Sequence, residues 1–186
     1  MNREQLHRLL VQAKASTQHT DFVIVGSLAI LGAIAQPPAT MVMSIDVDAF
    51  LKNDPGRTHE LAQALGQGSV FEDEHGYYLD PVSPDLPSFP QGWQDRLILL
   101  DFGDVRAFFV DPNDVGVSKY VRGEERDLRW LRAGLQHGLL NMDIIERRIS
   151  TAPMLEGELP LARKRMAAHK KKLAFQHRSE EHTSEL

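Results

Sequence analysis

Two aspartates, Asp46 and Asp48, flank one valine in the stretch "SIDVDAF" (residues 44–50). Residues 44–51 are apolar enough to form a strand, and strand side chains alternate between two faces. The two carboxylates should therefore lie side by side on one face of the strand. The opposite, apolar face should consist of Ile45, Val47 and Ala49. Neighbouring carboxylates repel each other, and a shared cation lets both stay ionised at neutral pH. Ligands that are all oxygen favour a hard cation, Mg²⁺ or Mn²⁺. A solvated edge strand is the alternative interpretation of an isolated Asp-x-Asp motif.

The stretch before this strand could hold a phosphate. Residues 21–26, "DFVIVG", should form a strand buried on both faces, and residues 27–35, "SLAILGAIA", a helix. Gly26 lets the backbone approach a ligand closely, and the free N–H groups of a helix start favour phosphate. The Ser27 hydroxyl could add a donor, or could simply cap the helix. Metal-assisted phosphoryl or nucleotidyl transfer requires such a phosphate site beside paired carboxylates.

The remaining elements follow from periodicity and from turn residues. We expect an N-terminal helix near residues 2–13, a helix within 54–66 capped at Thr58, and a strand over 74–82. A hairpin should span 96–110, followed by a helix that begins after Asp111. Two helices should lie within 124–149, and a basic helix over 159–175. Strands that alternate with helices, followed by helices alone, predict an α/β or α+β domain with a helical C-terminal portion.

Composition narrows the class of protein. The chain has 186 residues, enough for one domain, and no cysteine, which excludes disulfides, thiolate nucleophiles and Cys-ligated zinc. It shows no apolar signal segment and no stretch long enough to cross a bilayer, so we expect a cytoplasmic protein. Residues 178–186, "RSEEHTSEL", resemble the translation of a sequencing-library adapter and are treated as a non-native tail. Residues 1–150 should form the main domain and 151–177 a basic C-terminal helix.

"VGS", a following helix and then "SIDVD" resemble the signature of the nucleotidyltransferase superfamily with the polymerase-beta-like fold. The order "VGS…SIDVD…YYLDPV…GWQDRL…DPNDVGVSKYVRGEERDL" is most similar to small bacterial nucleotidyltransferase-like proteins of unknown function. Their relatives include nucleotidyltransferases of type IV toxin–antitoxin and abortive-infection systems. The resemblance covers about residues 20–150, and it implies a small mixed sheet flanked by helices.

The resemblance also implies roles for individual residues. Gly26 and Ser27 would hold the triphosphate, and Asp46 and Asp48 would bind the metal ions. A third carboxylate should come from a later strand, and Asp80 in "YYLDPV" fits that place. Two other aspartates have simpler explanations, because Asp101 lies at a hairpin turn and Asp111 fits a helix cap. A turn residue before a proline remains the alternative for Asp80.

Basic residues of "SKYVRGEERDL" would then contact the nucleotide. Lys119 matches a lysine that relatives place near the nucleotide, and an unbroken helix would put Arg122 and Arg126 on the same face. Gly123 could break that helix and leave a solvated basic face. Asp127 would be an ion-pair partner of Arg126 or Lys119 and not a metal ligand.

The sequence departs from the family's pattern in two ways. The spacing from Gly26 to Asp46 is long, and "AQPPAT" could hold the extra loop. Many relatives also carry an arginine shortly before Asp-x-Asp, where this chain reads "TMVMS". This second departure affects contacts to the acceptor or to phosphate, and leaves the metal site unaffected.

The predicted function is metal-dependent transfer of NMP from an NTP to an acceptor such as tRNA or another RNA, a protein or a small molecule. Two Mg²⁺ (or Mn²⁺) ions would lie on Asp46, Asp48 and Asp80. The alternative is a catalytically silent nucleotidyltransferase fold that acts as a binding partner in a toxin–antitoxin-type system. The basic stretch "ARKRMAAHKKK" could contact a nucleic-acid backbone, although a solvated helix face explains it more simply.

Overall fold

The strands form one mixed sheet in a computed structural model that describes the backbone of residues 1–183 and the side chains of residues 1–175. The strands are β1 (Asp21–Ile24), β2 (Asp46–Leu51), β3 (Tyr78–Pro81), β4 (Ile98–Asp101) and β5 (Arg106–Phe109). Their order is β3-β2-β1-β5-β4. The pairs β1–β5 and β2–β3 are parallel, whereas β1–β2 and β4–β5 are antiparallel. The predicted hairpin over 96–110 is thus confirmed as β4 and β5.

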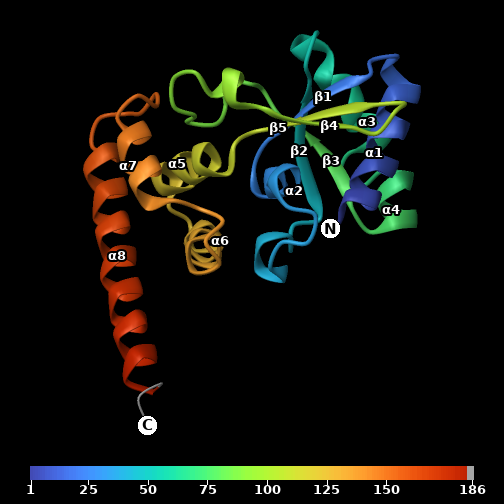
Figure 1. Cartoon of the computed structure of the whole chain (residues 1–186). Coiled ribbons are helices and arrows are strands. Elements are labelled where there is room, and N and C mark those ends of the chain that lie inside the picture. Colours follow the sequence, from blue (N-terminus) through green and yellow to red (C-terminus); the bar gives the residue numbers. More distant parts are fainter. Residues whose placement is uncertain (184–186) are drawn as a thin grey trace.

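Helices cover both faces of the sheet (Figure 1). The helices are α1 (Arg3–Thr17), α2 (Ile30–Ala33), α3 (Leu61–Leu65), α4 (Val70–His75), α5 (Pro112–Arg122), α6 (Glu125–Gln136), α7 (Met142–Ile149) and α8 (Glu158–Thr183). In Figure 1 α1, α3 and α4 gather on one side of the sheet, and α5 to α8 lie on the other. The predicted mixed α/β architecture with a helical C-terminal portion is confirmed.

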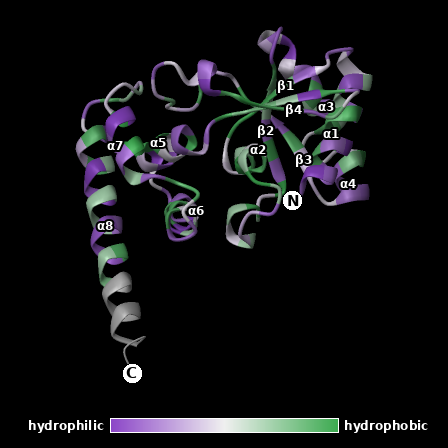
Figure 2. Cartoon of the chain, in the orientation of Figure 1, coloured by the Kyte–Doolittle hydropathy of each residue, from purple (hydrophilic) through white to green (hydrophobic). Residues whose placement is uncertain are grey.

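The central strand β1 is buried on both faces, as its continuous apolar run predicts. Phe22 and Ile24 pack with α1, while Val23 and Val25 pack with α5 and α6. In Figure 2 hydrophobic colours predominate in the centre of the sheet, and the helices carry both hydrophobic and hydrophilic residues. Burial of both faces fixes the end of β1, and therefore the position of the Gly26-Ser27 turn that follows it.

Four local predictions were wrong. The strand expected over 74–82 begins at Tyr78, because residues 70–75 form α4, which is capped by the Ser69 hydroxyl. The helix expected over 27–35 is a 3-10 turn, Ser27–Ala29, followed by the four-residue α2. Thr58 caps no helix; its buried hydroxyl accepts a hydrogen bond from the Leu51 backbone N–H at 3.0 Å. Ile45 precedes β2 and is 52% exposed, so it does not pack in the core.

Among residues 1–183, no helix combines the length and the hydropathy that a bilayer crossing requires. The predicted non-native tail, residues 178–186, lies outside the residues whose side chains are described.

Candidate functional site

Three carboxylates meet where β2 and β3 pair. The two strands run parallel, with Asp46 opposite Tyr78 and Asp48 opposite Asp80. One oxygen from each of Asp46, Asp48 and Asp80 lies within 4.8 Å of the other two. Among the described residues this is the one group of acidic or histidine side chains arranged to hold a metal ion. The structure therefore brings together the three residues that the sequence singled out.

The alternation of β2 puts two of these carboxylates on one face. Val47 and Ala49 are fully buried and pack with α1 and α3 on the opposite face. Because successive strand residues point in opposite directions, Asp46 and Asp48 must then point away from that core. The Ser44 hydroxyl donates to Asp46 and helps to hold its side chain.

The metal-free carboxylates repel one another. Burial, together with the charges of Asp46 and Asp80, raises the pKa of Asp48 from 3.8 to about 6, although Lys119 and Arg122 oppose the increase. Burial and the charge of Asp46 also raise the pKa of Asp80. Both causes penalise the ionised form, and a bound cation would remove the penalty.

Gly26 brings the backbone directly against Asp48. Its φ is +65°, and a Cβ added there would lie 2.1 Å from the Asp48 Oδ2. Any side chain at this position would therefore collide with the carboxylate and would also strain the backbone. The helix after Gly26 is too short to supply a large dipole, so backbone contact contributes more here than the predicted helix start does.

Ser27 is held by residues that are far away in the sequence. Its hydroxyl oxygen accepts a hydrogen bond from the Lys119 Nζ at 3.0 Å. Its carbonyl accepts one from the Trp130 Nε1 at 3.2 Å, and the same indole N–H contacts the Met41 carbonyl. Since the Ser27 oxygen already accepts from a lysine, its own proton is free to be donated to another group.

Lys119 is buried, and Asp127 compensates its charge. The Lys119 Nζ donates to the Asp127 Oδ1 at 3.0 Å and lies 5.1 Å from the centre of the Trp130 ring. Burial lowers the pKa of Lys119, and Asp127 opposes this. Burial would raise the pKa of Asp127, but hydrogen bonds from Arg122 and the charge of Lys119 bring it below its ordinary value. The pair is therefore held in its ionised form.

Gly123 ends α5, so the basic residues do not share one continuous helix face. It has a φ of +68° and caps the helix after Arg122. Arg122 donates two hydrogen bonds to Asp127, at 2.7 and 2.6 Å. Arg126 lies on α6 and pairs with Glu124. Of the two partners left open for Asp127, the structure selects Lys119, and it adds Arg122.

The sequence model of a family described as "Nucleotidyltransferase of unknown function (DUF6036)" matches residues 4–177. The chain belongs to this family. No curated protein and no solved structure matches the chain. The match includes the whole sheet and all three carboxylates, and it confirms the nucleotidyltransferase resemblance at the level of the family.

In this member of the nucleotidyltransferase family, a cavity of about 360 Å³ opens beside the carboxylates. Gly26, Asp48, Lys119 and Arg122 line its polar side. The apolar side comprises Val82, Leu86, Pro87, Phe89, Val115 and Val121. Leu86, Pro87 and Phe89 come from the proline-rich loop after β3, and sequence reasoning missed them. Nothing in the composition of that loop indicates which of its residues face a cavity.

A smaller hollow of about 200 Å³ is lined by Ser27. It is lined in part by Thr40, Met43 and Ser44, which belong to the "TMVMS" stretch where the family resemblance predicts an arginine. Arg126 and Arg129 of α6 line the same hollow. Cationic side chains therefore do lie beside this stretch, but they come from a helix more than 80 residues later in the sequence.

Proposed function

We propose that this chain is a metal-dependent nucleotidyltransferase that transfers NMP from an NTP to an acceptor. The observation that carries the proposal is the position of three carboxylates within 4.8 Å of one another, directly beside the Gly26-Ser27 turn. Membership of a nucleotidyltransferase family supports it. The alternative of a solvated edge strand does not fit Asp46 and Asp48, because β2 lies between β3 and β1 in the sheet.

The donor set fits a hard divalent cation. Asp46, Asp48 and Asp80 offer only oxygen atoms, which Mg²⁺ and Mn²⁺ prefer. Bound there, the ions would activate the acceptor group and stabilise the charge of the departing pyrophosphate. The raised pKa of Asp48 is the physical reason to expect tight coupling between this carboxylate and a cation.

The protein's own residues would position the triphosphate. The Ser27 hydroxyl would donate its free proton to a phosphate oxygen, while Lys119 fixes that hydroxyl. Arg122 is exposed enough to reach a phosphate while it remains near Asp127. Arg126 and Arg129 would contribute further positive charge from the smaller hollow that Ser27 lines. The apolar wall of the larger cavity would accept the nucleoside and exclude water from the reacting phosphate.

Replacing Asp46 tests this proposal. Asp46→Asn keeps the shape of the side chain but removes a ligand charge, so transfer of label from an α-labelled NTP should fall to background. Asp73→Asn, on the exposed surface of α4, is the matched control and should keep wild-type transfer. Total RNA, a protein extract and the chain itself would serve as acceptors, and circular dichroism would confirm that both variants fold. Transfer by Asp46→Asn at the wild-type rate would remove the metal mechanism.

A thermal-shift measurement separates the catalytic from the silent alternative. Mg²⁺ with one or more NTPs should raise the melting temperature of the wild type but not that of Asp46→Asn. No shift with any nucleotide would instead favour a catalytically silent binding partner of the toxin–antitoxin type.

A further inference from the structure

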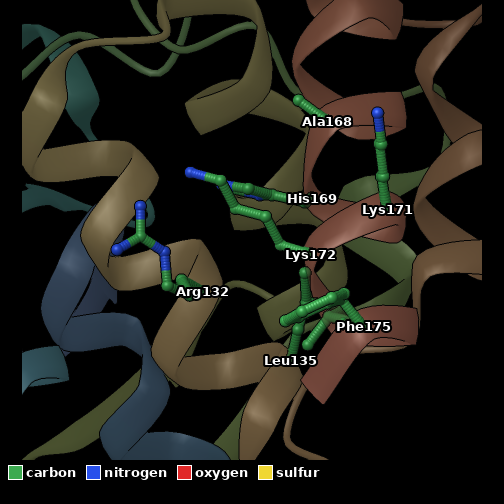
Figure 3. A pocket seen from close by; sticks show the side chains of 8 residues that line it. Arg132, Leu135, Ala168, His169, Lys171, Lys172 and Phe175 are labelled. Carbon is green, nitrogen blue, oxygen red and sulfur yellow. The ribbon is translucent and has the colours of Figure 1, made fainter. Parts of the chain in front are cut away.

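A second cavity, of about 690 Å³, lies between α6 and α8 and shares no lining residue with the carboxylate site (Figure 3). Its lining residues are Arg132, Leu135, Ala168, His169, Lys171, Lys172, Leu173 and Phe175. Four of the eight are basic or histidine, and none is acidic. The cavity thus combines positive charge with an apolar surface.

Three nitrogen-bearing side chains converge in this cavity. In Figure 3, His169 and Lys172 extend from α8 toward α6, and Arg132 extends from α6 beside them, while Lys171 points elsewhere. Within the described part of the chain, none of these residues takes part in an ion pair. Arg132 and Lys172 carry like charges, and bringing them together without a carboxylate among the described side chains costs free energy, which an anion would recover.

The Arg132 Nε supplies an independent indication of a ligand. This N–H is buried and has no hydrogen-bond partner among the described residues. A buried donor without an acceptor is costly, and a charged one more so. His169 is fixed nearby, because its Nδ1 is 2.8 Å from the hydroxyl of the buried Tyr120. Burial, together with the charges of Arg132 and Lys172, lowers the pKa of His169, as expected for a positive field without a counter-ion.

An apolar shelf adjoins this cationic group. Leu135 of α6 and Leu173 and Phe175 of α8 form it, and the Phe175 side chain is 72% exposed. An aromatic ring beside clustered cations is how proteins bind single-stranded nucleic acids, with phosphates on the cations and bases stacked on the ring. An acidic peptide would also satisfy the charge, but it would not use an exposed aromatic shelf for stacking.

The second cavity and the adjoining apolar shelf together form a groove. We propose that this groove binds a single strand of nucleic acid, with one phosphate on Arg132, His169 and Lys172 and an adjacent base on Phe175. That this strand is the acceptor for nucleotidyl transfer rests on the proposed function. Glu158, at the start of α8, lines the cavity beside the carboxylates, whereas the groove residues of α8 begin 10 positions later at Ala168. At 1.5 Å per residue the groove therefore begins roughly 15 Å along α8, a distance that a short strand spans.

Fluorescence anisotropy with a fluorescein-labelled 12-nucleotide oligouridylate tests the groove in the full-length chain. Lys172→Gln and Arg132→Gln should each weaken binding at least about fivefold and reduce the slope of log K against log salt by about 0.7. Lys164→Gln, at an exposed lysine of the same helix, removes the same charge and should stay within about twofold of the wild type. Phe175→Ala should weaken binding about tenfold without changing the salt slope.

The outcomes are decisive in both directions. If Lys164→Gln and Lys172→Gln weaken oligonucleotide binding equally, the attraction is diffuse and the proposed groove is wrong. The proposal is also wrong if the wild type does not bind the oligonucleotide, or if it binds polyglutamate more tightly. Arg132 is partly buried, so Arg132→Gln could fail to fold. In that case Lys172→Gln and Phe175→Ala, which replace exposed residues, test the groove. Asp46→Asn should bind the oligonucleotide normally. Nucleic-acid binding without any transfer would therefore retain the groove and reject the catalytic proposal, and the reverse result would reject the groove alone.

Discussion

Replacing Asp48 with asparagine should stabilise the metal-free protein at neutral pH. Burial and the charges of Asp46 and Asp80 raise the pKa of Asp48 from 3.8 to about 6. A pKa shift of one unit corresponds to about 1.4 kcal/mol, so the ionised Asp48 carboxylate lowers the free energy of unfolding by up to about 3 kcal/mol. Asparagine has the same shape and no charge, and it should recover about 1 to 3 kcal/mol, since part of the polar desolvation cost remains.

The sign and pH range of this effect follow from proton linkage. Because the pKa of Asp48 is higher in the folded than in the unfolded state, the folded protein binds more protons between pH 4 and 6. Wild-type stability should therefore fall as the pH rises through this range. The advantage of Asp48→Asn should be complete above pH about 6 and about half as large at pH 5.

Urea unfolding and thermal unfolding in EDTA at pH 5 and pH 8 measure this difference. The melting temperature of Asp48→Asn should exceed that of the wild type by about 3 to 10 °C at pH 8. Mg²⁺ should then stabilise the wild type and leave the variant unchanged. Asp73→Asn is the control for loss of one negative charge at an exposed position. A variant no more stable than the wild type at pH 8, or equally favoured at both pH values, would refute the reasoning.

Three further predictions test the surroundings of the carboxylates. Gly26→Ala should lower the free energy of unfolding by about 1 to 3 kcal/mol and abolish nucleotidyl transfer, because the φ of Gly26 is +65° and the new Cβ would collide with Asp48. Urea unfolding measures the first effect, and the transfer assay measures the second. Asp127→Asn should destabilise the fold by about 3 to 5 kcal/mol by leaving Lys119 buried without a counter-charge, whereas Lys119→Met combined with Asp127→Asn should recover much of that loss in the same unfolding experiment. The Kd of Mg²⁺, measured by calorimetry, should rise about tenfold between pH 7.5 and pH 5 as Asp48 is protonated, and a pH-independent Kd would mean that Asp48 is not a ligand.

The strands and the position of Asp46 and Asp48 on one face could be predicted because they depend on short-range patterns. Alternation along β2 places Asp46 and Asp48 on one face, and the resemblance to nucleotidyltransferases selected Asp80 among several later aspartates. The parallel pairing of β2 with β3 then brings the third carboxylate to the other two, because the register sets Asp48 opposite Asp80. A shift of one residue in this register would have moved Asp80 to the opposite face.

The prediction was wrong for the short helix α4, although the sequence carries signals for it, and for the start of β2. Ser69, Glu72 and Gly76 carry the start and stop signals of a short helix, yet the aromatic residues that follow favoured a strand over 74–82. The exposed Ile45 shows the opposite error, since period-two alternation predicts a face but not where the strand begins. Local periodicity thus identified the strands and the long helices, but it missed the short helix α4 and the exact ends of several elements.

Contacts between residues that are far apart in the sequence could not be predicted from the sequence alone. Lys119 and Ser27 are 92 residues apart, and the contact between them depends on how α5 packs against the sheet. The break at Gly123 decides whether Asp127 meets Lys119 or Arg126, and the sequence leaves both partners possible. Similarly, the cationic groove exists only because α8 lies beside α6.

The charges of the assembled site explain why nucleotide and metal should enter together. Asp48 lies beside Lys119 and Arg122, and Asp127 already neutralises much of the charge of these two cations. With these four groups and also Asp46 and Asp80 ionised, the net charge of the six is −2. They would therefore repel an NTP without metal ions, although Arg126 and Arg129 in the neighbouring hollow would oppose this repulsion. Divalent ions reverse that sign, and they also remove the repulsion that raises the pKa of Asp48. Lys119 and Arg122 therefore serve mainly to orient Ser27 and the phosphates, and the metal ions supply the attraction.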